Sequence, residues 1–219
     1  MARVFTRLGR EISIAVKSGG ADPETNPRLR AAVQNAKAAN MPKDNVENAI
    51  KKAAGKDAAD LAEVNFEGYA PHGVAVWIET ATDNNTRTVA NIRSYFNKAG
   101  GSLGTTGSLE FIFERKGVFV IPSEGVNMDD LEMLLIDNGA EDIQAGETDV
   151  TVYTSFTDFA PMQKALEQQG IKVETAELRR IPNNTVTLSD EQAEDVIKLI
   201  DRIEEDDDVQ NVFHNMNED

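Results

Sequence analysis

Three arginines near the start of the chain are spaced so that they could bind a row of phosphates. Arg3, Arg7 and Arg10 occupy positions i, i+4 and i+7, which places them on one face of a helix. Guanidinium groups aligned in this way suit the consecutive phosphates of a nucleic acid. A solvated helix face with incidental arginines is the other interpretation, and the spacing alone leaves both open.

Charge is distributed very unevenly around these arginines. Residues 1–56 hold eleven Lys+Arg and five Asp+Glu, a sum of +6, whereas the rest of the chain holds eleven and thirty-three, a sum of −22. The total of −16 would by itself argue against a nucleic-acid partner, but a basic segment on an acidic body indicates a polyanion-binding module. The candidate nucleic-acid-binding residues are Arg3, Arg7, Arg10, Lys17, Arg28, Arg30, Lys37, Lys43, Lys51 and Lys52.

Residues 82–88 form a polar stretch between an expected strand and an expected helix. Asn84, Asn85 and Arg87 could contact a polar partner at the helix N-terminus. The same residue types also cap helices by accepting hydrogen bonds from backbone N–H groups, and this interpretation is slightly favoured.

Residues 100–108 are unusually rich in glycine. Gly101, Gly104 and Gly107 could bring backbone N–H groups close to a phosphate. The stretch lacks the Lys-Ser/Thr ending of a P-loop and does not open a helix, so nucleotide hydrolysis is not expected. A helix end followed by a flexible entry to the next strand is the other interpretation.

Signals of an enzyme or a metal site are weak. The acidic run at residues 204–208 does not have EF-hand spacing and suits a solvated loop, while His72 and His214 are isolated. The chain has no cysteine, no apolar run of about 20 residues and no signal-peptide core. We therefore expect a cytoplasmic monomer that is not an enzyme and uses no cofactor, metal or membrane.

The elements that position the basic residues are predicted to be helices. Apolar residues recur at helical spacing from Val4 to Ala15, and Gly19-Gly20 ends that run. Asn26-Pro27 and Met41-Pro42 begin two further helices. Residues 1–58 are therefore predicted to form a basic three-helix bundle, followed by a linker.

Beyond the linker, strands and helices alternate. Residues 117–181 predict the order β-α-β-β-α-β of a ferredoxin-like unit, with a turn at 114–117 before it. Residues 63–115 and 182–219, with predicted strands that include 109–113 and 185–188, would form a second unit into which the first is inserted. The predicted fold class is α+β: an N-terminal three-helix bundle plus two ferredoxin-like α/β domains, one inserted into the other.

Long motifs in this order resemble the YebC/PmpR family along essentially the whole chain. They lie at residues 5–7, 19–30, 38–44, 69–73, 82–88, 100–108 and 206–215. The resemblance implies a three-domain protein, commonly described as a DNA-binding transcriptional regulator. Mitochondrial relatives are translational activators, and bacterial relatives have been linked to the ribosome and to relief of stalling. Family members usually begin with a further basic stretch containing Gly-His-Ser-Lys-Trp, so part of the family's basic surface is expected to be missing here.

Two functions remain open at this point. The first is a transcriptional regulator that binds DNA through the basic bundle. The alternative is a ribosome-associated translation factor that binds rRNA or tRNA through the bundle and residues 100–108. The sequence shows no helix-turn-helix with base-reading side chains, which weighs against sequence-specific DNA recognition. An acidic protein-interaction scaffold with an inert arginine face is a third, weaker possibility.

Overall fold

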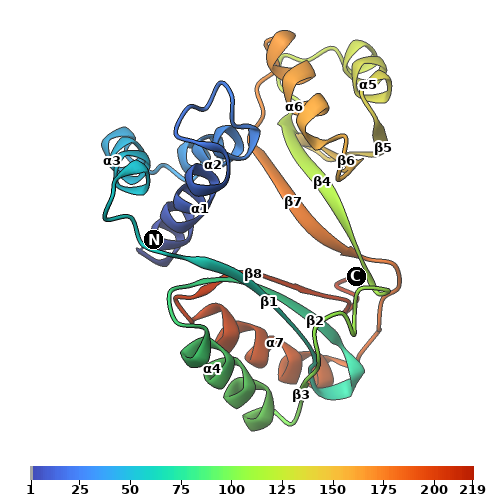
Figure 1. The fold of residues 1–219 in the computed structure, drawn as a ribbon. Helices are drawn as coiled ribbons and strands as arrows, with labels where there is room; N and C mark the ends of the chain where they lie inside the picture. The colour runs from blue at the N-terminus through green and yellow to red at the C-terminus, as the bar shows by residue number, and fades with distance from the viewer. Residues whose placement is uncertain (1) are drawn as a thin grey trace. The chain divides into compact units, whose positions relative to one another are not determined.

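The structure is a computed structural model that describes residues 2–219. It divides into two compact units, and the α+β class is confirmed by three N-terminal helices and two four-stranded antiparallel sheets with helices (Figure 1). Unit 1 comprises the chain up to Ala58 together with Arg115–Arg179. Unit 2 comprises Ala59–Glu114 and Arg180–Asp219. Within residues 2–219, no helix combines the length and the apolar character that a membrane span requires.

The first three helices of unit 1 are α1 (Ala2–Gly19), α2 (Pro27–Ala38) and α3 (Lys43–Ala54), as predicted. Their shared core contains Ile12, Val16, Leu29 and Val46. Asn26 closes the connection between α1 and α2. Its buried side chain accepts a hydrogen bond from the N–H of Leu29 (3.1 Å) and donates to the carbonyls of Ala15 (2.7 Å) and Gly20 (2.9 Å).

The rest of unit 1 is a sheet with ferredoxin-like connectivity. Its elements are β4 (Phe113–Pro122), α5 (Met128–Asp137), β5 (Ala140–Ala145), β6 (Asp149–Ser155), α6 (Phe159–Gln168) and β7 (Thr175–Pro182). The strand order is β5-β6-β4-β7. Helices α5 and α6 bury Leu131, Leu135, Met162 and Leu166 against it. The same core also takes in Ala31 of α2, so helix α2 packs on the sheet as well as on α1 and α3.

Helix α2 binds the open edge of strand β7. The Asn35 side chain donates to the carbonyl of Ala176 (2.9 Å) and accepts from its N–H (3.0 Å), while Gln34 donates to the carbonyl of Val173 (2.7 Å). An edge strand carries backbone groups that lack partners within the sheet. Asn35 supplies those partners at Ala176, and Gln34 binds the segment just before the strand.

Unit 2 has a sheet in the order β3-β1-β2-β8. Its elements are β1 (Ala62–Tyr69), a 3-10 turn (Pro71–Gly73), β2 (Ala75–Thr82), α4 (Asn85–Lys98), β3 (Ser102–Leu103), α7 (Asp190–Glu204) and β8 (Val209–His214). Helices α4 and α7 lie on the same side of the sheet (Figure 1). Their apolar faces meet it around Phe96, Ile92, Leu199 and Ile78.

Three local predictions were wrong. Residues 114–117, which were expected to form a turn, lie inside β4. Gly117 is required there by close packing and not by a turn, since a Cβ would lie 2.4 Å from Thr154 Oγ1 and 2.9 Å from the Phe159 ring. Residues 109–112 are a turn, not a strand, and Leu109 and Ile112 pack in the cluster around Trp77 while Phe111 is exposed. Residues 185–188 contribute only one isolated bridge, between Val186 and Met216.

Strand β1 was not predicted, and it changes how the second sheet is built. Apolar and polar residues do alternate from Val64 to Glu67, but only Val64 and Phe66 supply large apolar side chains, whereas β2 is apolar at four consecutive positions, 75–78. The antiparallel pairing of β1 with β2 supplies the strand that residues 109–113 were expected to provide. The order of strands therefore differs between the two sheets: the second sheet has the order β3-β1-β2-β8 and the first has the order β5-β6-β4-β7.

We predict that Asn26→Ala destabilises the protein by about 1–3 kcal/mol, because it removes a helix cap and leaves the carbonyls of Ala15 and Gly20 without this donor. Urea unfolding measures the change. The matched control is Asn45→Ala on the exposed side of α3, which should shift stability by no more than about 0.5 kcal/mol. Equal effects of the two substitutions would contradict this role of Asn26.

Candidate nucleic-acid interface

The arginines of α1 lie on one side of that helix. Arg3 is exposed, and Arg7 and Arg10 are partly exposed. The first turn of α1 carries no acidic residue that would neutralise the positive end of the helix dipole. Arg3 therefore adds its charge to an already positive helix terminus, which is the kind of place where phosphates bind.

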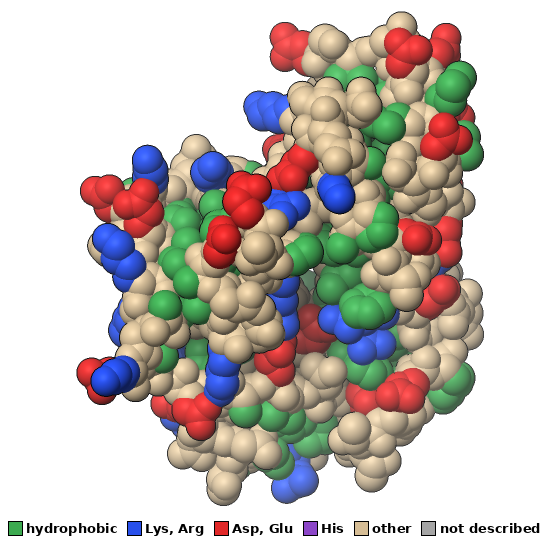
Figure 2. All heavy atoms as spheres, turned by 45° about the horizontal axis from the view of Figure 1, so that its top comes forward, with side chains coloured by type: hydrophobic (Ala, Val, Ile, Leu, Met, Phe, Trp, Pro, Cys, Tyr) green, Lys and Arg blue, Asp and Glu red, His purple; other side chains and the backbone are tan. Residues whose placement is uncertain are grey.

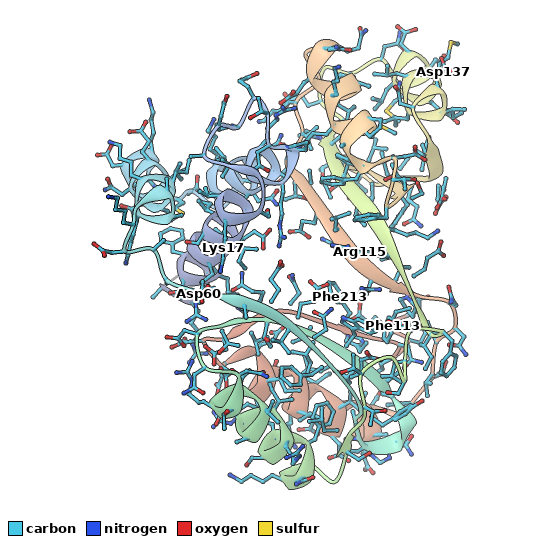
Figure 3. All side chains as sticks on the ribbon, viewed as in Figure 1. Lys17, Asp60, Phe113, Arg115, Asp137 and Phe213 are labelled. Carbon is cyan, nitrogen blue, oxygen red and sulfur yellow. The ribbon has the colours of Figure 1, made fainter. Side chains whose placement is uncertain are left out.

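The lysine candidates are distributed over all three helices and are exposed. Lys17 lies in the last turn of α1 (labelled in Figure 3) and Lys37 in the last turn of α2. On α3, Lys43 lies 3.6 Å from Glu47, and Lys51 and Lys52 occupy the last turn. Lysine in a last turn stabilises a helix through its dipole, so these positions also have a structural explanation. Figure 2 shows lysine and arginine side chains on the part of the surface that carries α3.

Arg28 and Arg30 are engaged within unit 1. The Arg28 guanidinium pairs with Glu11 of α1 at 2.8 Å. Arg30 donates to the carbonyls of Pro23 (3.0 Å) and Glu24 (2.7 Å) and pairs with Glu167 of α6 at 3.0 Å. These two arginines hold α1, the loop before α2, and α6 in place.

The polar stretch before α4 is a helix cap and an ion-pair network. Asn84 accepts a hydrogen bond from the N–H of Arg87 (3.1 Å), and Asn85 is the exposed first residue of the helix. The Arg87 side chain pairs with Asp83 and Asp208, each at 2.9 Å. Hydrogen bonds to Asp208 and then Asp83 raise the pKa of Arg87 above its ordinary value. Arg87 thus acts as an internal clamp on Asp208.

The acidic run before β8 is partly buried, which the sequence analysis did not predict. Asp208 is 2% exposed and also accepts from the Thr88 hydroxyl (2.8 Å). Asp206 accepts from the Tyr95 hydroxyl (2.8 Å) and from the Asn91 side chain (3.1 Å). Both carboxylates therefore attach helix α4 to the turn before β8. The polar positions 84, 87, 88, 91 and 95 on one face of α4 were the available signal.

Glu67, a buried residue of β1, organises the glycine-rich stretch. Its carboxylate accepts from the N–H groups of Gly107 (2.7 Å) and Leu109 (2.6 Å), and its carbonyl accepts from Gly104 (2.7 Å). The N–H of Gly101 donates to the carbonyl of Phe96 (2.9 Å). All three candidate glycines thus already donate their N–H groups internally. The close packing also explains Gly101, since a Cβ there would lie 2.4 Å from the Tyr69 carbonyl oxygen.

The part of the chain that the structure describes contains no group of three or more His, Cys, Asp or Glu residues able to hold a metal ion. His72 instead pairs with Asp195 of α7 at 2.9 Å, and His214 with Glu218 at 3.2 Å.

Two family models cover almost the whole chain. Residues 1–56 match the TACO1/YebC protein N-terminal domain, and residues 61–216 match the TACO1/YebC second and third domain. This chain belongs to the TACO1/YebC family. The match confirms the resemblance to the YebC family that the motifs indicated.

TACO1/YebC relatives are similar over about nine tenths of their length. A probable transcriptional regulatory protein of Porphyromonas gingivalis is 57% identical, with 100% of this chain and 90% of the relative covered. Another with the same name, from Cytophaga hutchinsonii, is 58% identical, with 100% and 92% covered. The crystal structure of the conserved hypothetical protein Aq1575 from Aquifex aeolicus matches with a TM-score of 0.86 and 43% identity, covering 99% of this chain and 90% of that one.

In this TACO1/YebC protein we predict that Glu67→Gln loosens the glycine-rich stretch and lowers stability by about 2–4 kcal/mol. The new amide presents an NH₂ group to one of two backbone N–H donors, and the hydrogen bonds lose their ionic component. Hydrogen exchange at residues 104–109 and urea unfolding measure both effects. Glu110→Gln, in the same turn but exposed, is the control, and a similar loss in that variant would contradict the assignment.

We also predict that Asp206→Asn lowers the pKa of Tyr95, which burial and then the bond to Asp206 raise from 10.0 to about 12. Because burial remains, the pKa should stay above 10.0. The raised value means that this contribution to stability is present below pH 10 and is lost as pH rises through about 12. Ultraviolet titration of phenolate, with Tyr69 and Tyr153 replaced by Phe, measures it. Asp207→Asn is the control and should leave the pKa of Tyr95 unchanged.

Proposed function

We propose that this protein is a transcriptional regulator that binds DNA through its N-terminal helices. The observation that carries the proposal is the excess of +6 charges in residues 1–56, displayed on α1–α3, beside a body of −22. The names of the relatives as probable transcriptional regulatory proteins support the same function. The binding face consists of the arginines of α1 and the exposed lysines: Arg3, Arg7, Arg10, Lys17, Lys37, Lys43, Lys51 and Lys52.

Contact with phosphates is expected to supply most of the affinity of such a face. Each arginine or lysine that neutralises a phosphate releases counterions, and this release makes affinity fall steeply with salt. The acidic body acts in the opposite sense because it repels the same backbone wherever it comes within about 8–10 Å, the screening length near physiological salt. Binding is therefore restricted to orientations that present α1–α3 to the duplex, which keeps non-specific affinity low.

A face of this kind binds the phosphates of RNA as well as those of DNA. The second candidate, a ribosome-associated translation factor that contacts rRNA or tRNA, makes the same prediction about the arginines. The two candidate functions differ only in whether the cellular target is promoter DNA or the ribosome. Binding to each target therefore has to be measured directly.

Replacing Arg3, Arg7 and Arg10 together with Ala should weaken binding to duplex DNA. If each arginine contacts one phosphate, the slope of log affinity against log salt falls by about 0.9 per arginine, or about 2.7 in total. Fluorescence anisotropy at several salt concentrations measures the slope. The control replaces Arg93, Lys98 and Lys198 of unit 2 with Ala, which changes net charge equally at exposed positions. Equal slopes in the two variants would reject the arginine face.

Footprinting on promoter DNA, compared with ribosome co-sedimentation, decides between DNA and the ribosome. A reproducible footprint without ribosome association supports the transcriptional function. Ribosome association that is lost in the triple arginine variant, without any footprint, would replace it with the translational one.

A further inference from the structure

Helix α5 exposes two large apolar side chains that its own sheet does not use. Met133 is 66% exposed and Ile136 is 58% exposed, whereas Leu131 and Leu135 on the opposite side are buried against the sheet. Residues three apart on a helix are neighbours, so Met133 and Ile136 form one apolar spot. The helix thus has one apolar face buried against the sheet and a second apolar strip exposed to solvent.

Carboxylates surround this strip. Asp129 and Asp137 lie one turn before and after Met133, and Glu132 lies one turn before Ile136. We call the surface made by Asp129, Asp130, Glu132, Met133, Ile136 and Asp137 the α5 face. None of its four carboxylates forms an ion pair with another residue between 2 and 219. Figure 3 marks Asp137 at the end of the helix.

Helix stability does not account for all of these charges. Asp129 and Asp130 lie in the first turn, where a negative charge favours the helix dipole. Asp137 lies at the other end, where it opposes the dipole, and the last turn holds no basic residue. The negative charge therefore continues along the whole face, including a position where it costs helix stability.

The sequence that contains the face is strongly acidic. Residues 117–163 contain ten Asp+Glu and no Lys or Arg, which gives 0 − 10 = −10. The edge strand β5 exposes Asp142, while its Glu141 is paired with Lys116 at 2.8 Å. Nucleic acid and anionic membranes are repelled by such a field. A cationic partner is attracted. Because Met133 and Ile136 lie along one helix, they best match a partner segment whose apolar residues also recur at helical spacing.

We propose that the α5 face is a docking site for a basic amphipathic helix of another protein. The partner places apolar side chains on Met133 and Ile136, and its lysines or arginines meet the surrounding carboxylates. Helix-on-helix recognition of this kind uses anchors spaced i, i+3 and i+4. The proposal goes beyond nucleic-acid binding by α1–α3 and does not depend on it.

The test uses a fluorescein-labelled 18-residue peptide of Leu and Lys whose leucines fall on one helical face, and a scrambled peptide of the same composition. In anisotropy titrations the full-length protein should bind the amphipathic peptide at least about tenfold more tightly than the scrambled one. Met133→Ser with Ile136→Ser should abolish that preference. Asp129→Asn with Asp137→Asn should weaken binding of both peptides and reduce its dependence on salt.

The matched control is Ile197→Ser, which removes an apolar side chain that is 46% exposed on α7, a helix that is also rich in acidic residues. It should leave both affinities unchanged. Equal affinity of the two peptides for the wild type, or equal loss in the α7 variant, would overturn the proposal. Peptide-induced hydrogen-exchange protection should fall on residues 128–137, and protection elsewhere would also overturn it. A dimer in sedimentation that dissociates in the Met133/Ile136 variant would assign the face to a second copy of the chain instead.

Discussion

Buried polar side chains that bond to backbone groups hold this structure together at its irregular points. A polar group that has left water must find its hydrogen bonds within the protein, or folding loses the free energy of solvating it. Asn26 meets this requirement between α1 and α2, and Glu67 meets it beneath the glycine-rich stretch, while the partly buried Asn35 plays a similar part at the edge of β7. Each side chain fixes the relative position of two segments through directional hydrogen bonds, which apolar packing alone does not provide. The arrangement of α1 and α2 therefore depends on the buried amide of Asn26 as well as on apolar packing.

Charge segregation is the second level of organisation, and it works within a single unit. Unit 1 contains both the +6 segment and the 47 residues, 117–163, that lack any basic side chain. The first attracts a polyanion and the second repels it, while a polycation experiences the opposite pattern. A nucleic acid and a basic protein segment would consequently be directed to different surfaces of the same unit. The overall charge of −16 describes neither surface.

The sequence predicted best those features that depend on local rules. The Asn26-Pro27 cap, the glycines after α1 and the apolar period located α1–α3, and the order of elements from 117 to 181 predicted a ferredoxin-like sheet. Strand β1 was missed because only Val64 and Phe66 supply large apolar side chains to its buried face, and Gly117 predicted a turn although it serves close packing inside β4. Pairing and packing between distant segments leave no local pattern, so these features could not be predicted.

The contrast between local rules and contacts of distant segments also explains why some candidate binding residues have a structural role instead. Arg87 and the three glycines were selected because their types can bind anions, yet the groups that would do so are occupied by Asp208, Phe96 and Glu67. A carboxylate on a distant strand satisfies a backbone N–H or a guanidinium as well as a phosphate does, and residue type alone cannot distinguish the two. The arginines of α1 differ because their spacing produces an aligned row on a positive helix terminus. Spacing within one helix is a constraint that the sequence states directly, and for this reason the proposed interface is built on α1.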